Sequence, residues 1–155
     1  QLRGSKHTLK NSIVEWSSGN GVLLEGTGHR VTNNIIANSN YMASYAAPVR
    51  INGTRHRITY NTIEGAGRDA ISFDWHTAGF DGSKIEIAYN DISRFGMLST
   101  DLGAIYICCY VNLAGGAIHH NWIRDTQAFS PFWGTRGIYL DIESYNSTIN
   151  HNVVW

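Results

Sequence analysis

The stretch GTRGIYLDIESYNSTINHNVVW, residues 134–155, decides the fold. It begins with a short run of alternating apolar and polar residues at 137–141, passes through a polar turn, and ends in a second short run at 151–154. Alternation with a period of two is typical of β-strands. The same two-part phrase recurs towards the N-terminus, so this stretch is one unit of a repeating structure.

Two blocks define the repeat. In the first block an Asn is followed two positions later by an aliphatic residue, and successive Asn residues lie 23, 27, 29, 31 and 31 positions apart. In the second block the first and third positions are apolar, whereas the second and fourth are mostly polar. The Asn residues are Asn11, Asn34, Asn61, Asn90, Asn121 and Asn152, and the second block begins at Val22, Val49, Ile71, Ile105 and Ile138.

Stacking of these units predicts an all-β, parallel β-helix of about five to six coils. A single unit cannot bury its apolar face, whereas stacked copies share a continuous core. Each strand would pair with its counterpart in the next coil, about 4.8 Å away. Stacked Asn side chains would then bond to one another. Turn Asn residues in an antiparallel protein are the alternative. We expect one β-helix domain over residues 1–155, a fragment of a longer helix with both ends uncapped.

Composition excludes several classes of function. A net charge of zero gives no electrostatic footprint for nucleic acid or an anionic membrane. No run of about 18 apolar residues is present, which argues against a membrane-spanning helix.

Cys108 and Cys109 are adjacent, so strand alternation would point them to opposite faces and makes a disulfide between them improbable. His29 and His56 occupy one repeat position and are expected to stack on the surface. The His spacing fits no metal site, and we expect no cofactor.

The outward positions of the second block form a candidate catalytic face. One column of side chains, the outward ladder, reads Glu25, Asn52, Asp74, Cys108 and Asp141. Asp74 and Asp141 lie two coils apart, about 10 Å between backbones, and glycoside hydrolases use carboxyl pairs about 5 to 9.5 Å apart. For any single acid, a structural turn hydrogen bond is the alternative. Further carboxylates at the strand edges are Asp69, Asp101 and Glu143, and the candidate substrate-binding residues are Arg50, His76, Tyr106, Tyr139, Glu143 and Trp133.

Uneven loops lengthen the coils on one edge, where solenoids usually carry their binding residues. The loop at 126–135 holds Phe129, Phe132 and Trp133. An exposed aromatic cluster of this kind suits stacking on sugar rings. Packing of the loop against the flank of the solenoid is the alternative.

The phrases DLGAIY at 101–106, GIYLD at 137–141 and HNVV at 151–154 resemble right-handed parallel β-helix carbohydrate-active proteins. They are most similar to glycoside hydrolase family 141, with fucosidase and xylanase activities, and more loosely to the family 120 β-xylosidases. The resemblance covers roughly the C-terminal third. It implies Asp101 and Asp141 as catalytic carboxylates, a plant or microbial polysaccharide as partner, and secretion from a bacterial cell or display at its surface. The related proteins commonly carry an acid or Gly directly after Leu-Asp, where this chain has Ile142.

Both arguments select Asp141 and differ over its partner, Asp74 or Asp101. On a straight strand Asp101 would lie about 20 Å from Asp141. The family pairing therefore needs a bend in the chain, which Gly103 permits. A polysaccharide hydrolase is the favoured prediction. A non-catalytic adhesin or filament is the alternative, followed by a lyase or epimerase, for which the outward face offers only Arg50 as a cation.

Overall fold

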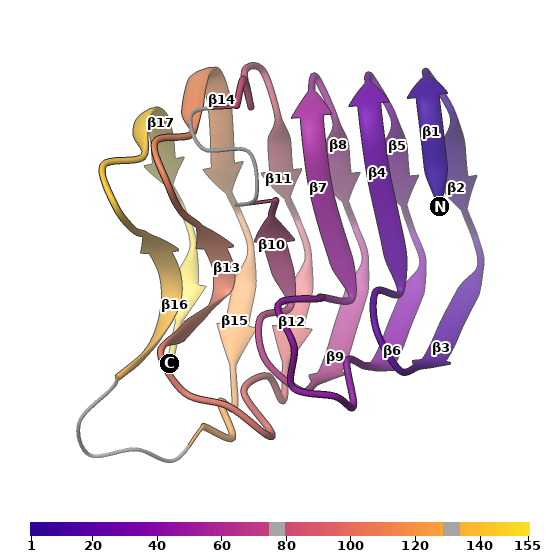
Figure 1. Cartoon of the computed structure of the whole chain (residues 1–155), viewed down its shortest axis with the longest axis vertical. Coiled ribbons are helices and arrows are strands. Elements are labelled where there is room, and N and C mark those ends of the chain that lie inside the picture. The colour runs from indigo at the N-terminus through magenta and orange to yellow at the C-terminus, as the bar shows by residue number, and fades with distance from the viewer. Residues whose placement is uncertain (75–79, 129–133) are drawn as a thin grey trace.

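The computed structural model describes residues 1–74, 80–128 and 134–155. The chain winds through six coils, and each coil gives one strand to each of three six-stranded parallel sheets (Figure 1). The predicted all-β parallel β-helix is therefore confirmed. The described residues include no helix long and apolar enough to cross a bilayer.

The strands of each sheet follow one another along the axis in chain order. Sheet A contains β1 (Leu2–Ser5), β4 (Val22–Thr27), β7 (Val49–Thr54), β10 (Ile71–Phe73), β13 (Leu102–Ile107) and β16 (Thr135–Leu140). Sheet B contains β2 (Thr8–Lys10), β5 (Arg30–Thr32), β8 (Arg57–Thr59), β11 (Glu86–Ala88), β14 (Asn112–His119) and β17 (Tyr145–Asn150). Sheet C contains β3 (Ile13–Ser17), β6 (Ile35–Ser39), β9 (Thr62–Ala66), β12 (Asp91–Ser93), β15 (Trp122–Arg124) and β18 (Val153–Val154).

The core is built from columns of aliphatic side chains that point inward from the three sheets. In sheet B, Val31 pairs with Ile58 and Ile58 with Ile87, and all three are fully buried. Sheet C repeats this pattern, for example at Ile63, whereas a rung of sheet A contributes two inward side chains, such as Val49 and Ile51. Full burial of such a side chain contributes about 1.5–3 kcal/mol. The apolar positions of the sequence repeat are therefore the rungs of one continuous core.

A column of buried Asn side chains fixes the corner between sheets B and C. The side-chain amide of Asn61 donates to Asn90 Oδ1 at 3.0 Å, and the backbone N–H of Asn61 donates to the same oxygen at 3.0 Å. Asn90 repeats both bonds with Asn121. Each Asn thus satisfies the polar groups of the neighbouring coil in a buried place where an unpaired group would be costly. The column comprises Asn34, Asn61, Asn90, Asn121 and Asn152.

Every connection between sheets B and C has two residues, and the first has a positive φ. These pairs are Asn11–Ser12, Asn33–Asn34, Tyr60–Asn61, Tyr89–Asn90, His120–Asn121 and His151–Asn152. In the first coil the repeat position that the sequence assigns to Asn11 is wrong by one residue. Ser12, not Asn11, occupies the ladder position, since the Ser12 N–H donates to Asn34 Oδ1 at 3.0 Å, whereas Asn11 lies beside Asn33.

His29 and His56 stack as predicted, with ring centroids 5.1 Å apart, but they are buried and not on the surface. The backbone N–H of His29 donates to His56 Nδ1 at 3.1 Å, and the N–H of His7 donates to His29 Nδ1 at 3.1 Å. With Nδ1 as the acceptor, Nε2 is left as the donor of each ring. It lies 3.0 Å from the Glu25 carbonyl oxygen in His29 and 3.4 Å from the Asn52 carbonyl oxygen in His56. Burial lowers the pKa of His56 to about 4. This column fills the corner between sheets A and B.

Asn90→Ala should destabilise the fold by about 3 kcal/mol, because it leaves the Asn61 N–H buried without a partner and removes one acceptor from the Asn61 side-chain amide and one donor from the Ile58 carbonyl oxygen. The free energy of unfolding from urea titration measures this. Asn150→Ala, an exposed Asn in β17, is the control and should change stability by less than about 0.5 kcal/mol. Equal losses in the two variants would contradict a structural role for the ladder.

Candidate functional site

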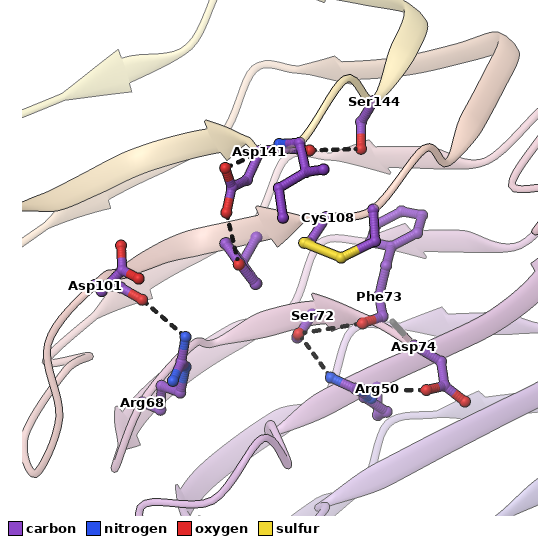
Figure 2. Close-up of a disulfide and its surroundings, with 12 residues drawn as sticks. Arg50, Arg68, Ser72, Phe73, Asp74, Asp101, Cys108, Asp141 and Ser144 are labelled. Atoms are coloured by element: carbon purple, nitrogen blue, oxygen red, sulfur yellow. Dashed lines mark hydrogen bonds and ion pairs between the residues drawn. A yellow bond between two sulfur atoms is a disulfide. The ribbon is translucent and has the colours of Figure 1, made fainter. Parts of the chain in front are cut away.

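The outward ladder lies on sheet A in the predicted register. Glu25 pairs with Asn52, and Asp74 follows Phe73, the partner of Ile51. Asp141 follows Leu140, the partner of Ile107, so Asp141 stands one coil beyond Cys108. Asp74 and Asp141 are therefore two coils apart, with Cys108 between them (Figure 2).

Asp141 is held by two hydrogen-bond donors. The Tyr106 hydroxyl donates to Oδ2 at 2.9 Å, and the Ile142 backbone N–H donates to Oδ1 at 2.8 Å. Burial, followed by the hydrogen bond to Asp141, raises the pKa of Tyr106, so the phenol keeps its proton and donates at neutral pH. Two donors aimed at the carboxyl suit its ionised form.

Asp141 lies at the start of a tight turn. Ile142 and Glu143 have φ values of 41° and 54°, and the Ser144 hydroxyl donates to the Asp141 carbonyl oxygen at 3.0 Å. Two consecutive positive φ values are typical of a type I′ turn. This turn directs Glu143 into solvent, outside the pocket lining described next, so the predicted substrate-binding acid is not brought to the pocket.

Asp101 and Asp141 line one pocket of about 300 Å³. Asp101 precedes β13 with a φ of 53°. Arg68 fixes this backbone by donating from Nη2 to the Asp101 carbonyl oxygen at 2.8 Å (Figure 2). The side chain of Asp101 is 45% exposed, with Arg136 Nη1 3.7 Å from its Oδ1. The residues around the pocket are Tyr45, Asp101, Tyr106, Cys108, Cys109, Asp141 and Ile142.

Asp74 does not line this pocket. Its Oδ1 lies 3.2 Å from Arg50 Nη2 and its Oδ2 3.2 Å from Asn52 Nδ2. Arg50 is buried and also donates to the Tyr45 carbonyl oxygen at 2.7 Å and the Ser72 hydroxyl at 2.9 Å. The guanidinium is thus engaged within the protein. The structure therefore puts Asp101 and Asp141 in the lining of one pocket, and it holds Asp74 in a separate polar cluster.

The two predicted tyrosines lie side by side on sheet A. The rings of Tyr106 and Tyr139 are 5.3 Å apart, and Arg136 stacks 4.0 Å above Tyr139. Partial burial, followed by the charge of Asp141, raises the pKa of Tyr139. The other predicted substrate-binding residues, His76 and Trp133, lie outside the described residues, as do Phe129 and Phe132 of the aromatic loop.

Arg68 and Asp69 form a buried pair behind the pocket. The sequence predicts Asp69 as one of the strand-edge carboxylates of the candidate face, but it gives Arg68 no role. Asp69 is fully buried, and burial raises its pKa to about 6. Its Oδ1 accepts from the Gly103 N–H at 3.3 Å. Its Oδ2 lies 3.4 Å from Arg68 Nε, an ion pair without hydrogen-bond geometry, so neither atom has a hydrogen-bond partner. The adjacent Arg-Asp dipeptide was the only local signal, because the contacts that matter are 34 residues away in sequence.

Cys108 and Cys109 form a disulfide, which corrects the prediction from strand alternation (Figure 2). β13 ends at Ile107, so both cysteines lie in the following turn, where alternation no longer applies. Cys109 and Tyr110 have φ values of 75° and 63°. The Tyr110 N–H then donates to the Ile142 carbonyl oxygen at 2.9 Å. The bridged turn therefore supports the turn that carries Asp141, and both cysteines line the pocket.

Within residues 1–74, 80–128 and 134–155, no three His, Cys, Asp or Glu side chains gather in a group that could hold a metal ion. The acidic residues of sheet A are instead paired with donors from the protein, as described for Asp74 and Asp141.

Comparison with known proteins identifies the architecture. A family model described as "right handed beta helix region" matches residues 1–155. No curated protein and no solved structure matches the chain. The family model covers carbohydrate-active enzymes and also non-catalytic proteins, and it does not distinguish glycoside hydrolase family 141 or 120.

Asp69→Asn should change the pH dependence of stability. Because the folded-state pKa of Asp69 is raised from 3.8 to about 6, its contribution to stability is full below about pH 4 and is lost as pH rises through 6. Between pH 4 and 7, we expect the free energy of unfolding of the variant to rise relative to that of the wild type by up to about 3 kcal/mol. Urea unfolding of both proteins at each pH measures the difference. A difference independent of pH would contradict the raised pKa.

Removal of the disulfide by Cys108→Ser with Cys109→Ser should loosen the site locally. The closed loop is too short for a large chain-entropy effect, so global stability should change by less than about 1 kcal/mol. Hydrogen exchange of the Tyr110 amide should accelerate about tenfold, because its turn loses the covalent link. The Asn61 amide, far from the turn, is the control. A large fall in global stability with unchanged exchange at Tyr110 would contradict this role.

Proposed function

The chain belongs to the right-handed β-helix family, and we propose that it is a glycoside hydrolase that cleaves a polysaccharide with the carboxylate pair Asp101 and Asp141. The observation that carries the proposal is that both side chains line one pocket of about 300 Å³. This volume lies at the small end of the range for small-molecule pockets and suits one sugar unit of a chain. The resemblance to glycoside hydrolase family 141 supports the same pair.

The two carboxyl groups have environments that suit different roles. Glycosidic cleavage needs one carboxylic acid that protonates the leaving oxygen and one carboxylate that acts as base or nucleophile. Asp141 accepts hydrogen bonds from Tyr106 and from the Ile142 N–H, an arrangement that suits the carboxylate role. Asp101, whose side chain is nearly half exposed, is then the group that delivers a proton to the departing sugar oxygen.

The pocket also offers contacts for a sugar. Tyr45 and Ile142 supply apolar surface, and the disulfide adds polarisable sulfur atoms to the same lining. Sugar rings have apolar C–H faces that pack on such surfaces while their hydroxyls bond to carboxylates. The disulfide further supports an oxidising compartment, and we propose secretion from the cell or display at its surface.

The non-catalytic alternative, an adhesin or filament, has one observation in its favour. Both oxygens of Asp141 and both oxygens of Asp74 already accept hydrogen bonds from the protein. A lyase or epimerase has less support on this face, because Arg50 is buried and engaged with three acceptors.

Asp141→Asn and Asp101→Asn should each lower hydrolysis at least about 100-fold, because each removes a group that must carry or transfer a proton. Release of reducing ends from xylan, fucosylated and pectic polysaccharides measures this. Glu143→Gln, two residues from Asp141 but outside the pocket, is the matched control, and Asp74→Asn tests the alternative partner. Circular dichroism checks that each variant is folded.

Unchanged turnover in Asp141→Asn would refute the proposal. Loss in Asp74→Asn without loss in Asp101→Asn would move the pairing to Asp74. A wild-type protein that binds a polysaccharide of the panel and cleaves none would support the non-catalytic alternative.

A further inference from the structure

Positive charge gathers at the corner between sheets A and B in the first three coils. Lys6, Gly28 and Arg55 are equivalent positions of this corner, since each follows a residue of the in-register set Ser5, Thr27 and Thr54. They share positive φ values of 59°, 70° and 59°. Two positions later, Arg30 and Arg57 pair in register on neighbouring rungs of sheet B. We name Lys6, Arg30, Arg55 and Arg57 the cationic corner.

These side chains surround a groove of about 450 Å³. Gly28 occupies the position between Lys6 and Arg55 and has no side chain, so the groove stays open there. A Cβ built on Gly28 would meet only Lys6 Cγ, at 3.5 Å. The lining contains four cations and no acid: Lys6, Thr8, Gly28, Arg30, Arg55 and Arg57. The groove is therefore a shaped, exposed site with one sign of charge.

Most of this charge has no acidic partner among the residues that the structure describes. Arg57 pairs with Glu86, whereas Lys6, Arg30 and Arg55 have no ion pair with any acid of the described chain. Arg30 and Arg57 stand one rung apart, about 4.8 Å between backbones, and like charges on facing positions of neighbouring strands destabilise a sheet. An anion bound between them would remove that repulsion.

The zero net charge conceals a strong separation along the helix axis. Residues 1–60 contain seven Lys and Arg and two Asp and Glu, whereas residues 61–155 contain five and ten. The absence of an electrostatic footprint, inferred from the total, therefore does not hold for the first coils. A long polyanion would be attracted to these coils and repelled by the acidic coils that follow. The first coils are therefore suited to a ligand segment that carries only a few anionic groups.

We propose that the cationic corner binds the carboxylate or sulfate groups of an acidic polysaccharide strand. The groove shares Arg30 and Arg57 with a neighbouring hollow of about 320 Å³. That hollow is lined also by Thr32, Thr59, Tyr60, Tyr89 and Glu86, the acid that pairs with Arg57. Hydroxyl and aromatic groups beside guanidinium groups match a ligand that carries both hydroxyls and anions. This favours an acidic sugar chain over nucleic acid, and the site is separate from the Asp101 and Asp141 pocket.

Binding of the full chain to sulfated dextran, oligogalacturonate, unmodified dextran and double-stranded DNA tests the proposal by calorimetry at two salt concentrations. We expect saturable binding of at least one acidic polysaccharide, weaker at high salt because the charges are exposed, and none of unmodified dextran. The tighter of the two acidic probes identifies sulfate or carboxylate as the preferred group. Arg30→Gln with Arg55→Gln should weaken this binding about tenfold.

Arg94→Gln with Arg124→Gln is the matched control, because it removes the same charge at the end of β12 and in β15, where both arginines have acidic partners. Binding should be unchanged in this control and in Asp101→Asn with Asp141→Asn, which separates the groove from the proposed catalytic pocket. No saturable binding of either acidic polysaccharide, equal weakening in the control, insensitivity to salt, or tighter binding of DNA would each overturn the proposal.

Discussion

The rest of the structure depends on the register between coils, and the Asn column holds that register. Parallel strands can slip along one another, but a slip of one residue would exchange core and solvent faces. Here it would also separate the buried backbone and side-chain N–H groups of Asn61 from the Asn90 oxygen that accepts from both. Apolar burial makes stacking favourable, and the amide column makes one alignment far better than its neighbours. The register that the Asn column fixes also sets the relative positions of side chains on the other sheets.

The candidate site depends directly on this register between coils. The register sets Asp141 one rung beyond Cys108 and puts Tyr139 beside Tyr106. Turns then add what straight strands cannot supply. The bridged turn at Cys108 and Cys109 meets the turn after Asp141 through one backbone bond, and Arg68 holds the backbone of Asp101 from behind. The pocket therefore combines a fixed sheet face with turns that left-handed backbone conformations redirect.

Sequence reasoning succeeded where interactions repeat and failed where they are specific to one corner. The strands and their register can be predicted because the same apolar pattern recurs in every coil. Strand alternation does not predict the Cys108–Cys109 bond, because β13 ends at Ile107, before both cysteines. The sequence predicts His29 and His56 on the surface, because nothing local indicates that their Nδ1 atoms accept backbone hydrogen bonds from the neighbouring coil. The ion pair of Arg68 and Asp69 was missed because burial there depends on residues distant in sequence.

The constant two-residue corner between sheets B and C contrasts with the corners on either side of sheet A. Tyr45 and Asp101 come from the long connections that lead into sheet A, and Cys108, Cys109, Asp141 and Ile142 come from those that leave it. Insertions and deletions at these edges can remodel the pocket wall while the amide column opposite stays untouched. Such a scaffold can diversify what it recognises by changing loop length alone, and homologues should differ most in the segments that build the pocket.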